Sequence, residues 1–429
     1  MLWLFLGTLF LFVLTGIPVV FALGLSNIAL MKAMDLQFMV LPSKMISGMN
    51  SFPLLAIPFF MFVGEVMNHG GIAKRLVNFA DAIVGHITGG LGHVNILASM
   101  FFGGISGSAI ADTAAIGGLL IPPMIEQDYP AEYSAAITAS SAVIGIIIPP
   151  SIPFILYGII TNTSIAQLFM AGIIPGILVG LSLMATTYYT TKKHGYGHIV
   201  EAEKVQKFTL SRLWETFKEA VLALTIPFLV VGGILGGVFT ATEAGAVAAF
   251  VSLILALVVY KEVTVKDLPG ILLATAKTTA IVLFLCGMAM VTAWLLTVAR
   301  VPFELAELLT SLTDSTIGIL LITNVLLFLV GFVMDLTPAM LILAPILLPV
   351  MRQVGIDPVY FGVIMSINLG IGLITPPVGT VLYVATGVAD ITLEDLVKSI
   401  LPFLFTLLAV LALLIAFPQI VMFIPNLMR

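Results

Sequence analysis

The residues most able to do chemistry in this chain are glycines, prolines and hydroxyl side chains grouped in three short segments. Gly103–Ser108 reads GGISGS, Gly145–Pro153 reads GIIIPPSIP, and Gly372–Gly379 reads GLITPPVG. A proline removes a backbone donor and clashes with the preceding helical turn, so each proline pair should unwind a helix. The freed carbonyl oxygens and the negative ends of the half-helices could together coordinate a small cation such as Na⁺.

Hydroxyl groups and helix ends extend this chemistry. Oxygen ligands for a cation could also come from four side chains, those of Ser106, Ser108, Ser151 and Thr375. The N-termini of the half-helices would point N–H donors at an anionic substrate. Two ordinary proline kinks are the alternative, but the matching positions of the proline pairs in the two halves of the chain favour a paired binding site.

Five charged residues interrupt or border apolar segments, namely Glu65, Asp112, Glu243, Arg300 and Asp335. Asp112 and Asp335 each follow a proposed turn, where the carboxylate could orient the turn or attract the cation. The alternative role for both is to cap the following helix as an N-terminal acid. Arg300 either closes an outer gate or lies at the membrane interface, and the sequence leaves both open.

The elements that hold these residues must be membrane helices. Hydrophobic residues make up 60% of the chain, charged residues only 9%, and the mean hydropathy is +1.19, whereas a soluble domain has about 25% charged residues. A helix needs roughly 20 apolar residues to cross a bilayer. Long apolar runs cover Met1–Met31, Leu54–Met67, Ile165–Tyr189, Ala220–Thr240, Ala244–Tyr260 and Leu401–Ile424. We therefore expect an all-α polytopic protein in a lipid bilayer. The net charge of −5 gives no sign of nucleic-acid binding.

Proline and glycine positions repeat between the two halves of the chain at one constant interval. The matching pairs are Pro122 and Pro349, Pro149 and Pro376, Pro175 and Pro402, Gly104 and Gly331, and Gly145 and Gly372. We call this shared interval, from Pro122 to Pro349, the repeat offset. We expect two repeats, 1–190 and 220–429, joined by a polar linker at 191–219. Duplications of this kind are common in secondary transporters, often with opposite membrane orientation.

The positive-inside rule predicts that the basic linker lies on the cytoplasmic side. Counting crossings outward from it predicts that a hairpin at about 90–127 opens to the cytoplasm and a hairpin at about 317–351 opens to the opposite face. Each arm of the first hairpin is expected to be too short to span. We predict two re-entrant hairpins, because irregular backbone survives at membrane depth only when it is buried or lines a water-filled cavity. Broken helices should follow at about 131–160 and 358–388. A glycine-rich packing face is the alternative for the first hairpin.

Two rival functions can be weighed. Gly104–Gly107 fits the G-x-S-G pattern of intramembrane serine proteases, which would need a histidine beside Ser106, and His93 lies in the same hairpin. A passive channel is possible, but inverted repeats with paired broken helices suit alternating access better. An ATP-driven pump is disfavoured because no G-x-x-x-x-G-K-[ST] motif occurs.

Taken together, FFGGISGSAIADTAAIG, GIIIPPSIP and GLITPPVGT resemble the large membrane subunit, of the DctM or SiaM type, of tripartite ATP-independent periplasmic (TRAP) transporters. The resemblance covers essentially the whole chain. It implies Na⁺-coupled import of an organic acid across the bacterial inner membrane by an elevator movement. It also implies a periplasmic substrate-binding protein of the DctP or SiaP type and a small four-helix membrane subunit of the DctQ or SiaQ type, as a separate chain. Sialic acid is the first expected substrate and a C4-dicarboxylate the second.

The resemblance also implies ligand sets. The first Na⁺ site would use Gly103, Ser106, Gly145, Ile148 and Pro149, and the second Gly331, Asp335, Gly372, Thr375 and Pro376. Substrate binding or gating would involve Ser108, Asp112, Ser151 and Arg300. The second tip departs from the glycine–serine pattern of the first, so the same ligands cannot be assumed there.

Overall fold

The structure, a computed structural model, describes residues 1–197, 208–313, 315–376 and 378–427, and these form helices and connecting turns. The first half contains α1 (Leu2–Leu14), α2 (Val19–Ala33), α3 (Val40–Met49), η1 (Phe52–Leu55), α4 (Ala56–His69), α5 (Ile72–Val84), α6 (Gly90–Ser106), α7 (Ala109–Glu126), α8 (Ala131–Ala142), η2 (Val143–Ile146), α9 (Ile152–Thr161) and α10 (Ile165–His194). The second half contains α11 (Leu210–Leu235), α12 (Ala241–Ile254), η3 (Leu255–Val259), α13 (Leu268–Val298), α14 (Val301–Leu312), α15 (Thr316–Gly331), α16 (Leu336–Gln353), α17 (Pro358–Gly372), α18 (Thr380–Ala389), α19 (Leu393–Ala416) and α20 (Pro418–Leu427).

Eight helical segments are long and apolar enough to cross a membrane, which makes this a multi-pass membrane protein as the composition predicts. These segments are η1 with α4, α7, α10, α11, α12 with η3, α13, α16 and α19. The fold is therefore all-helical in the part of the chain that the structure describes.

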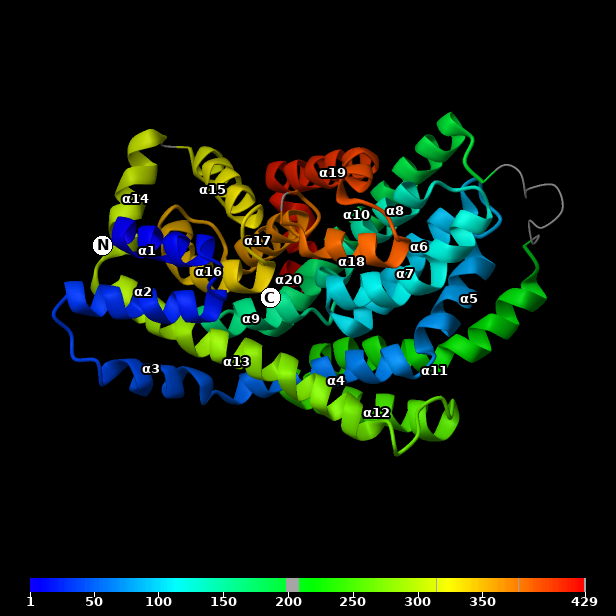
Figure 1. The fold of residues 1–429 in the computed structure, drawn as a ribbon, viewed down its shortest axis with the longest axis horizontal. Coiled ribbons are helices and arrows are strands. Elements are labelled where there is room, and N and C mark those ends of the chain that lie inside the picture. Colours follow the sequence, from blue (N-terminus) through cyan, green and yellow to red (C-terminus); the bar gives the residue numbers. More distant parts are fainter. Residues whose placement is uncertain (198–207, 314, 377, 428–429) are drawn as a thin grey trace.

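The helices fall into two groups that Figure 1 separates. Long helices α11, α12 and α13 lie along one side of the molecule together with α3 and α4, and α4 packs on both α12 and α13. The hairpins, the broken helices and α10 and α19 form a more compact group on the other side (Figure 1). We call the first group the scaffold and the second the hairpin block.

The hairpin block contains the expected hairpins and helix breaks. Hairpin 1 is α6 and α7, and hairpin 2 is α15 and α16. The first broken helix is α8 with η2 followed by α9, and the second is α17 followed by α18. The tip of hairpin 1 is short, and Gly107 there has a φ of +61°, which favours glycine.

Side-chain bonds repeat at the same offset as the prolines. The Tyr133 hydroxyl donates to the carbonyl of Thr187, and the Tyr360 hydroxyl donates to the carbonyl of Leu414. The donor and acceptor residues of the second bond each lie one repeat offset after those of the first. An asparagine also bonds the broken helix in each half, through Asn95 with Ser141 and through Asn324 with Asn368; here only the broken-helix residues Ser141 and Asn368 are separated by the repeat offset. The two halves therefore share one local architecture, while their opposite orientation in a membrane stays a prediction.

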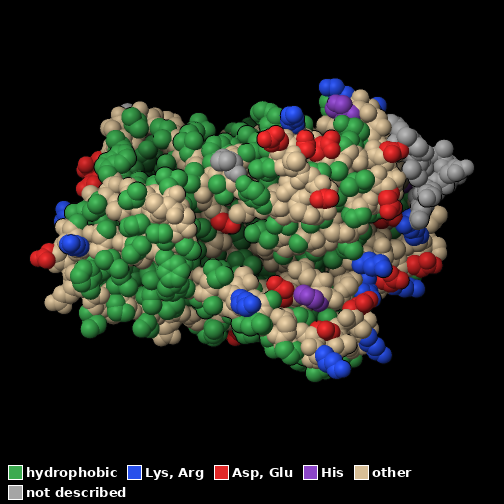
Figure 2. Space-filling model, in the orientation of Figure 1, with side chains coloured by type: hydrophobic (Ala, Val, Ile, Leu, Met, Phe, Trp, Pro, Cys, Tyr) green, Lys and Arg blue, Asp and Glu red, His purple; other side chains and the backbone are tan. Residues whose placement is uncertain are grey.

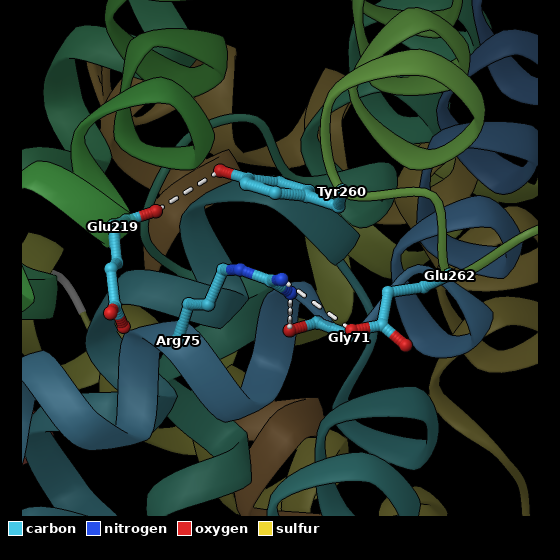
Figure 3. Close-up of polar contacts among 5 residues, drawn as sticks. All are labelled: Gly71, Arg75, Glu219, Tyr260 and Glu262. Atoms are coloured by element: carbon cyan, nitrogen blue, oxygen red, sulfur yellow. Dashed lines mark hydrogen bonds and ion pairs between the residues drawn. The ribbon is translucent and has the colours of Figure 1, made fainter.

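One end of the molecule carries most of the charge. Figure 2 shows Lys and Arg side chains gathered toward the end where the linker leaves α10 and enters α11. On α5 at that end, Arg75 donates to the carbonyl of Gly71 (2.9 Å), pairs with Glu262 (3.4 Å) and lies over the Tyr260 ring (Figure 3). The Tyr260 hydroxyl donates to the carbonyl of Glu219 on α11 (3.2 Å). This group, the Arg75 cluster, ties α5, α11 and the loop after η3 together.

Three sequence expectations need correction or limits. Met1–Met31 forms two helices that break before Pro18 and pack on each other, because Gly16 and Pro18 end the helical pattern. The arm α7 has 18 residues and is long and apolar enough to cross by itself, so the expectation that each arm is too short is wrong there. Part of the polar linker, 198–207, lies outside the described residues, and its last residues form the first turns of α11.

Candidate functional site

The tip of hairpin 1 packs directly on the break in the first broken helix. A Cβ atom on Gly103 would overlap the Cα of Gly145, and one on Gly104 would lie 3.4 Å from the carbonyl oxygen of Pro149. The two backbones can approach this closely only because neither Gly103 nor Gly145 has a side chain. The structure therefore brings the tip of hairpin 1 together with Gly145, Ile148 and Pro149, three of the residues expected for the first Na⁺ site.

Hairpin 2 makes the same contact with the second broken helix. A Cβ on Gly331 would lie 3.2 Å from the Cα of Gly372, and one on Gly372 would lie 2.8 Å from the Cα of Gly331. Thr375 is buried just beyond, and its hydroxyl donates to the carbonyl of Ile371 (2.7 Å). Each half thus presses a hairpin glycine against a glycine at the helix break.

The first break exposes oxygen atoms of the kind a cation needs. No described backbone N–H donates to the carbonyls of Ile148 or Pro149. Ser151 bridges the break, because its hydroxyl donates to the carbonyl of Ile146 (2.6 Å) and accepts from the N–H of Phe154 (3.3 Å). Unwound carbonyls and half-helix ends are the ligands that transporters offer to Na⁺, so the donor set fits that ion.

Polar side chains at the two tips act as helix caps. Ser108 accepts from the N–H of Ala111 at the start of α7 (3.4 Å), and Asp335 accepts from the N–H of Thr337 at the start of α16 (3.4 Å). Ser106 is buried and accepts from the N–H of Ser108 (3.4 Å). Asp335 therefore takes the capping role that the sequence offered as an alternative, and its counterpart in the first half, one repeat offset earlier, is Ser108.

Asp112 behaves differently from Asp335. It lies one turn into α7, is fully buried, and neither carboxylate oxygen has a hydrogen-bond partner. The Ser99 hydroxyl on α6 lies near Asp112 but makes no hydrogen bond with it. It bonds instead with the hydroxyl of Ser141 (3.1 Å). The sequence predicts the same two alternative roles for Asp112 and Asp335, and the structure shows that of these two only Asp335 caps a helix.

Both tips line one central cavity of about 460 Å³. Hairpin 1 contributes Gly107–Ile110 and hairpin 2 contributes Asp335–Pro338. The first broken helix adds Ile146, Ile152 and Pro153. Across from them, the scaffold helix α13 and the start of α2 close the cavity. Segments from both halves of the chain thus face a single space.

The helix ends around the central cavity favour an anion. Helices α7, α9 and α16 all begin at its lining, with Ala109, Ile152 and Leu336 as their first residues. A helix N-terminus presents unpaired N–H groups and a partial positive charge. The described lining contains no Lys or Arg, so the positive potential there comes from backbone.

Not every expected site residue reaches this cavity. Ser108 and Asp335 line it, whereas Asp112 lies behind the tip of hairpin 1 and Arg300 is exposed at the junction of α13 and α14. Sequence reasoning missed the scaffold wall, for example Met61 and Thr278. Nothing distinguishes these two from other residues of apolar helices, so no sequence signal could have found them.

The protease hypothesis fails on geometry. His93 and Ser106 lie near opposite ends of α6, a separation of about 20 Å along a helix. His93 is instead within hydrogen-bond distance of the carbonyl of Thr88 (3.1 Å). A serine nucleophile needs its base within hydrogen-bond reach, so Ser106 has no catalytic partner in His93.

Comparison with known proteins identifies the family. The family model of the tripartite ATP-independent periplasmic transporter, DctM component, matches residues 6–420. The chain is 43% identical over 419 residues to the 2,3-diketo-L-gulonate TRAP transporter large permease protein YiaN of Escherichia coli, covering 97% of each chain. It is 40% identical over 425 residues to the sialic acid TRAP transporter large permease protein SiaM of Vibrio cholerae, covering 98% of this chain and 97% of that one.

A solved structure shares the fold. The YdaH transporter of Alcanivorax borkumensis superposes with a TM-score of 0.62 at 17% identity, covering 88% of this chain and 87% of that one. At this level of sequence identity, the similarity shows a shared fold and nothing about function. The match to the family model and the relatives at about 40% identity show that this chain is a transporter subunit rather than an enzyme, and that it belongs to the DctM family of TRAP transporter large permeases.

Proposed function

We propose that this chain imports an organic acid across the bacterial inner membrane and couples the import to Na⁺ entry. The observation that carries the proposal is the central cavity, where both hairpin tips meet and three helices begin. An organic acid brings a carboxylate to these helix N-termini, and the apolar remainder of the lining excludes competing water.

The two glycine contacts next to the cavity support Na⁺ as the coupling ion. The contacts of Gly103 with Gly145 and of Gly331 with Gly372 each place a hairpin backbone against the last helical turn before a break. Cations held there would add positive charge beside the central cavity. Asp335 reaches the cavity with a carboxylate that repels an anion, so a bound Na⁺ would favour substrate binding by offsetting that repulsion.

The substrate is an organic acid such as sialic acid or a C4-dicarboxylate, delivered by a periplasmic substrate-binding protein. YiaN and SiaM have similar sequence identity to this chain, yet their names refer to two different acids. A cavity that recognises a carboxylate through backbone N–H groups is compatible with both, which leaves selection to the binding protein. A small four-helix subunit, as a separate chain, would complete the membrane complex against the scaffold.

Transport would follow an elevator movement of the hairpin block past the scaffold. The central cavity lies at the boundary of the two groups, with hairpin tips on one wall and α13 on the other. Displacement of the hairpin block would expose the site to each face in turn. The ion gradient then biases which loaded state moves, and no ATP is needed.

The test is uptake into proteoliposomes that contain the chain, the small subunit and the binding protein loaded with radiolabelled acid. We expect accumulation against a concentration gradient with an inward Na⁺ gradient and none with an equal K⁺ gradient. Uptake that is equally fast with K⁺ would overturn Na⁺ coupling. Equilibration without accumulation would indicate a passive channel instead.

A further inference from the structure

A second, outer cavity of about 660 Å³ lies between the scaffold and the hairpin block. Its scaffold wall comes from α3 and α13, and its other wall comes from the final turns of α9 and α16. Lys44 and Arg352 line it, and the described lining has no Asp or Glu. The outer cavity therefore has two cations and no acidic side chain to neutralise them.

The outer cavity follows the same seam as the central cavity. On α9, Pro153 lines the central cavity and Ile160 lines the outer one. On α16, Pro338 lines the central cavity and Pro345 lines the outer one. Each of these steps along a helix corresponds to about 10 Å. Helix α13 also lines both cavities. The two cavities are thus successive spaces between the same three helices.

The two cations have no ion pair among the described residues. The ammonium of Lys44, on α3, lies 5.3 Å from the centre of the Trp294 ring on α13. Arg352 is in the last turn of α16, where a cation also stabilises the helix C-terminus. That ordinary role does not extend to Lys44, which is not in the last turn of its helix.

The position of these cations is unusual for a membrane protein. Counting crossings from the basic linker places the ends of α9, α13 and α16 at the periplasmic face. The positive-inside rule disfavours Lys and Arg in short segments on that face. A pair of unpaired cations in a cavity raises the local concentration of anions and their rate of association.

We propose that the outer cavity is an encounter site for the carboxylate of an organic acid on its way from the binding protein to the central cavity. Lys44 and Arg352 attract the carboxylate, and Trp294 with the hydroxyls of Thr161 and Thr297 contacts the rest of the molecule. The acid then descends about 10 Å along the seam to the helix N-termini. This inference rests on the proposed import of an organic acid.

Trp294 supplies a direct binding assay, because the chain has only three tryptophans and the other two, Trp3 and Trp214, are exposed. In a Trp3→Phe, Trp214→Phe background, sialic acid and succinate should each change the fluorescence saturably, while neutral N-acetylmannosamine should not. Lys44→Gln with Arg352→Gln should abolish the change. The absence of a response to both acids at millimolar concentration would overturn the proposal.

Lipid headgroups carry the same anionic chemistry, so the vesicle composition separates the two sources. The chain is reconstituted in phosphatidylcholine alone and in phosphatidylcholine with phosphatidylglycerol. An acid response in pure phosphatidylcholine supports the encounter site. A fluorescence change that follows phosphatidylglycerol and is indifferent to added acid would make the cavity a lipid site and overturn the proposal.

Transport distinguishes this inference from the proposed function. If the complete wild-type complex takes up no organic acid with an inward Na⁺ gradient, the proposed function itself fails. If wild type transports, the double variant should need about tenfold more loaded binding protein for half-maximal uptake, with the maximal rate retained, and the difference should shrink at high salt. The matched control is Lys266→Gln, an exposed lysine outside both cavities. Equal half-saturation of the double variant and the control would overturn the encounter site.

Discussion

Among the described residues, Asp112 is an acidic side chain that is fully buried with both oxygens unbonded. A charge at membrane depth costs roughly 2.5–3.5 kcal/mol on insertion scales, and such residues commonly mark ion or substrate pathways. Its position, one turn behind the tip that packs on Gly145, places its carboxyl group next to the expected first Na⁺ site. We therefore predict that Asp112 acts in transport rather than in folding.

The change Asp112→Asn tests that prediction. The amide keeps the shape and removes the ionisable carboxyl group, so we expect a thermal unfolding midpoint at or above that of wild type and at least about tenfold slower Na⁺-driven uptake. Uptake is measured across a range of Na⁺ concentrations. Thr113→Val is the control, since Thr113 is a buried neighbour whose hydroxyl bonds only to the carbonyl of Ala109. Normal uptake by Asp112→Asn would assign the residue to structure.

Asp335 combines a cap with a charge, and two substitutions separate them. Asparagine caps helices as well as aspartate does, whereas alanine loses about 1 kcal/mol of cap stabilisation. We therefore expect Asp335→Asn to unfold at the wild-type temperature and Asp335→Ala to unfold lower, with both requiring more Na⁺ for uptake. Ser108→Ala removes the equivalent cap of hairpin 1 for comparison. If Asp335→Asn kept the wild-type Na⁺ dependence, the carboxylate would be only a cap.

At the scale of elements, the hairpin tips and helix breaks could be predicted because glycine and proline act locally. The left-handed turn at Gly107 favours glycine, and the proline pair at Pro149 ends a helix whatever surrounds it. The repeat offset alone already pairs Asp335 with Ser108 rather than with Asp112, and the cap geometry of the two tips agrees with that pairing. The scaffold wall of the cavity was out of reach, because only tertiary packing brings Thr278 to the tips.

The contact of each tip with its broken helix depends on the absence of side chains. Gly103→Ala would force two backbones apart, so we expect at least about tenfold slower uptake and a lower unfolding midpoint. Gly118→Ala on α7 is the matched control, since a Cβ there meets nothing within 4 Å and alanine is favoured in a helix by roughly 0.5–1 kcal/mol. Detergent-solubilised protein is compared by thermal unfolding and proteoliposomes by uptake. Equal behaviour of the two variants would mean that the tip is not held against the break.

The Arg75 cluster fixes α5 to α11 and to the loop after η3 (Figure 3). Arg75→Ala removes the stacking on Tyr260, the bond to Gly71 and the pair with Glu262 together. The ion pair is partly exposed and contributes little, and the stacking contributes about 0.5–1 kcal/mol. We expect Arg75→Ala to lower the unfolding midpoint measurably and Tyr260→Phe, which keeps the ring, to lower it less. A larger loss for Tyr260→Phe would show that the hydroxyl bond to Glu219 dominates.

At the scale of the whole molecule, the two hairpins extend in opposite directions from one cavity. In Figure 1 hairpin 1 reaches toward the end that carries the linker, and hairpin 2 reaches toward the other end. The tips still meet, since Ala109 and Leu336 line the same space. An inverted repeat explains both facts, because a hairpin entering from each face must end near the middle.

The sidedness of the hairpin bases tests the inversion. Glu126 and Gln353 are exposed, end α7 and α16, and are separated by the repeat offset, so they are equivalent positions in the repeat. Single cysteines at each, in a Cys286→Ala background, are treated with an impermeant thiol reagent in right-side-out and inside-out vesicles. We expect the position 126 cysteine to react only from the cytoplasmic face and the position 353 cysteine only from the periplasmic face, because the basic linker sets the side and an odd number of crossings separates the hairpins. Lys266→Cys, in the loop between η3 and α13, is the cytoplasmic reference. Labelling of both base positions from one face would make the repeat parallel. An elevator that alternates between two equivalent hairpins would then lose its structural basis.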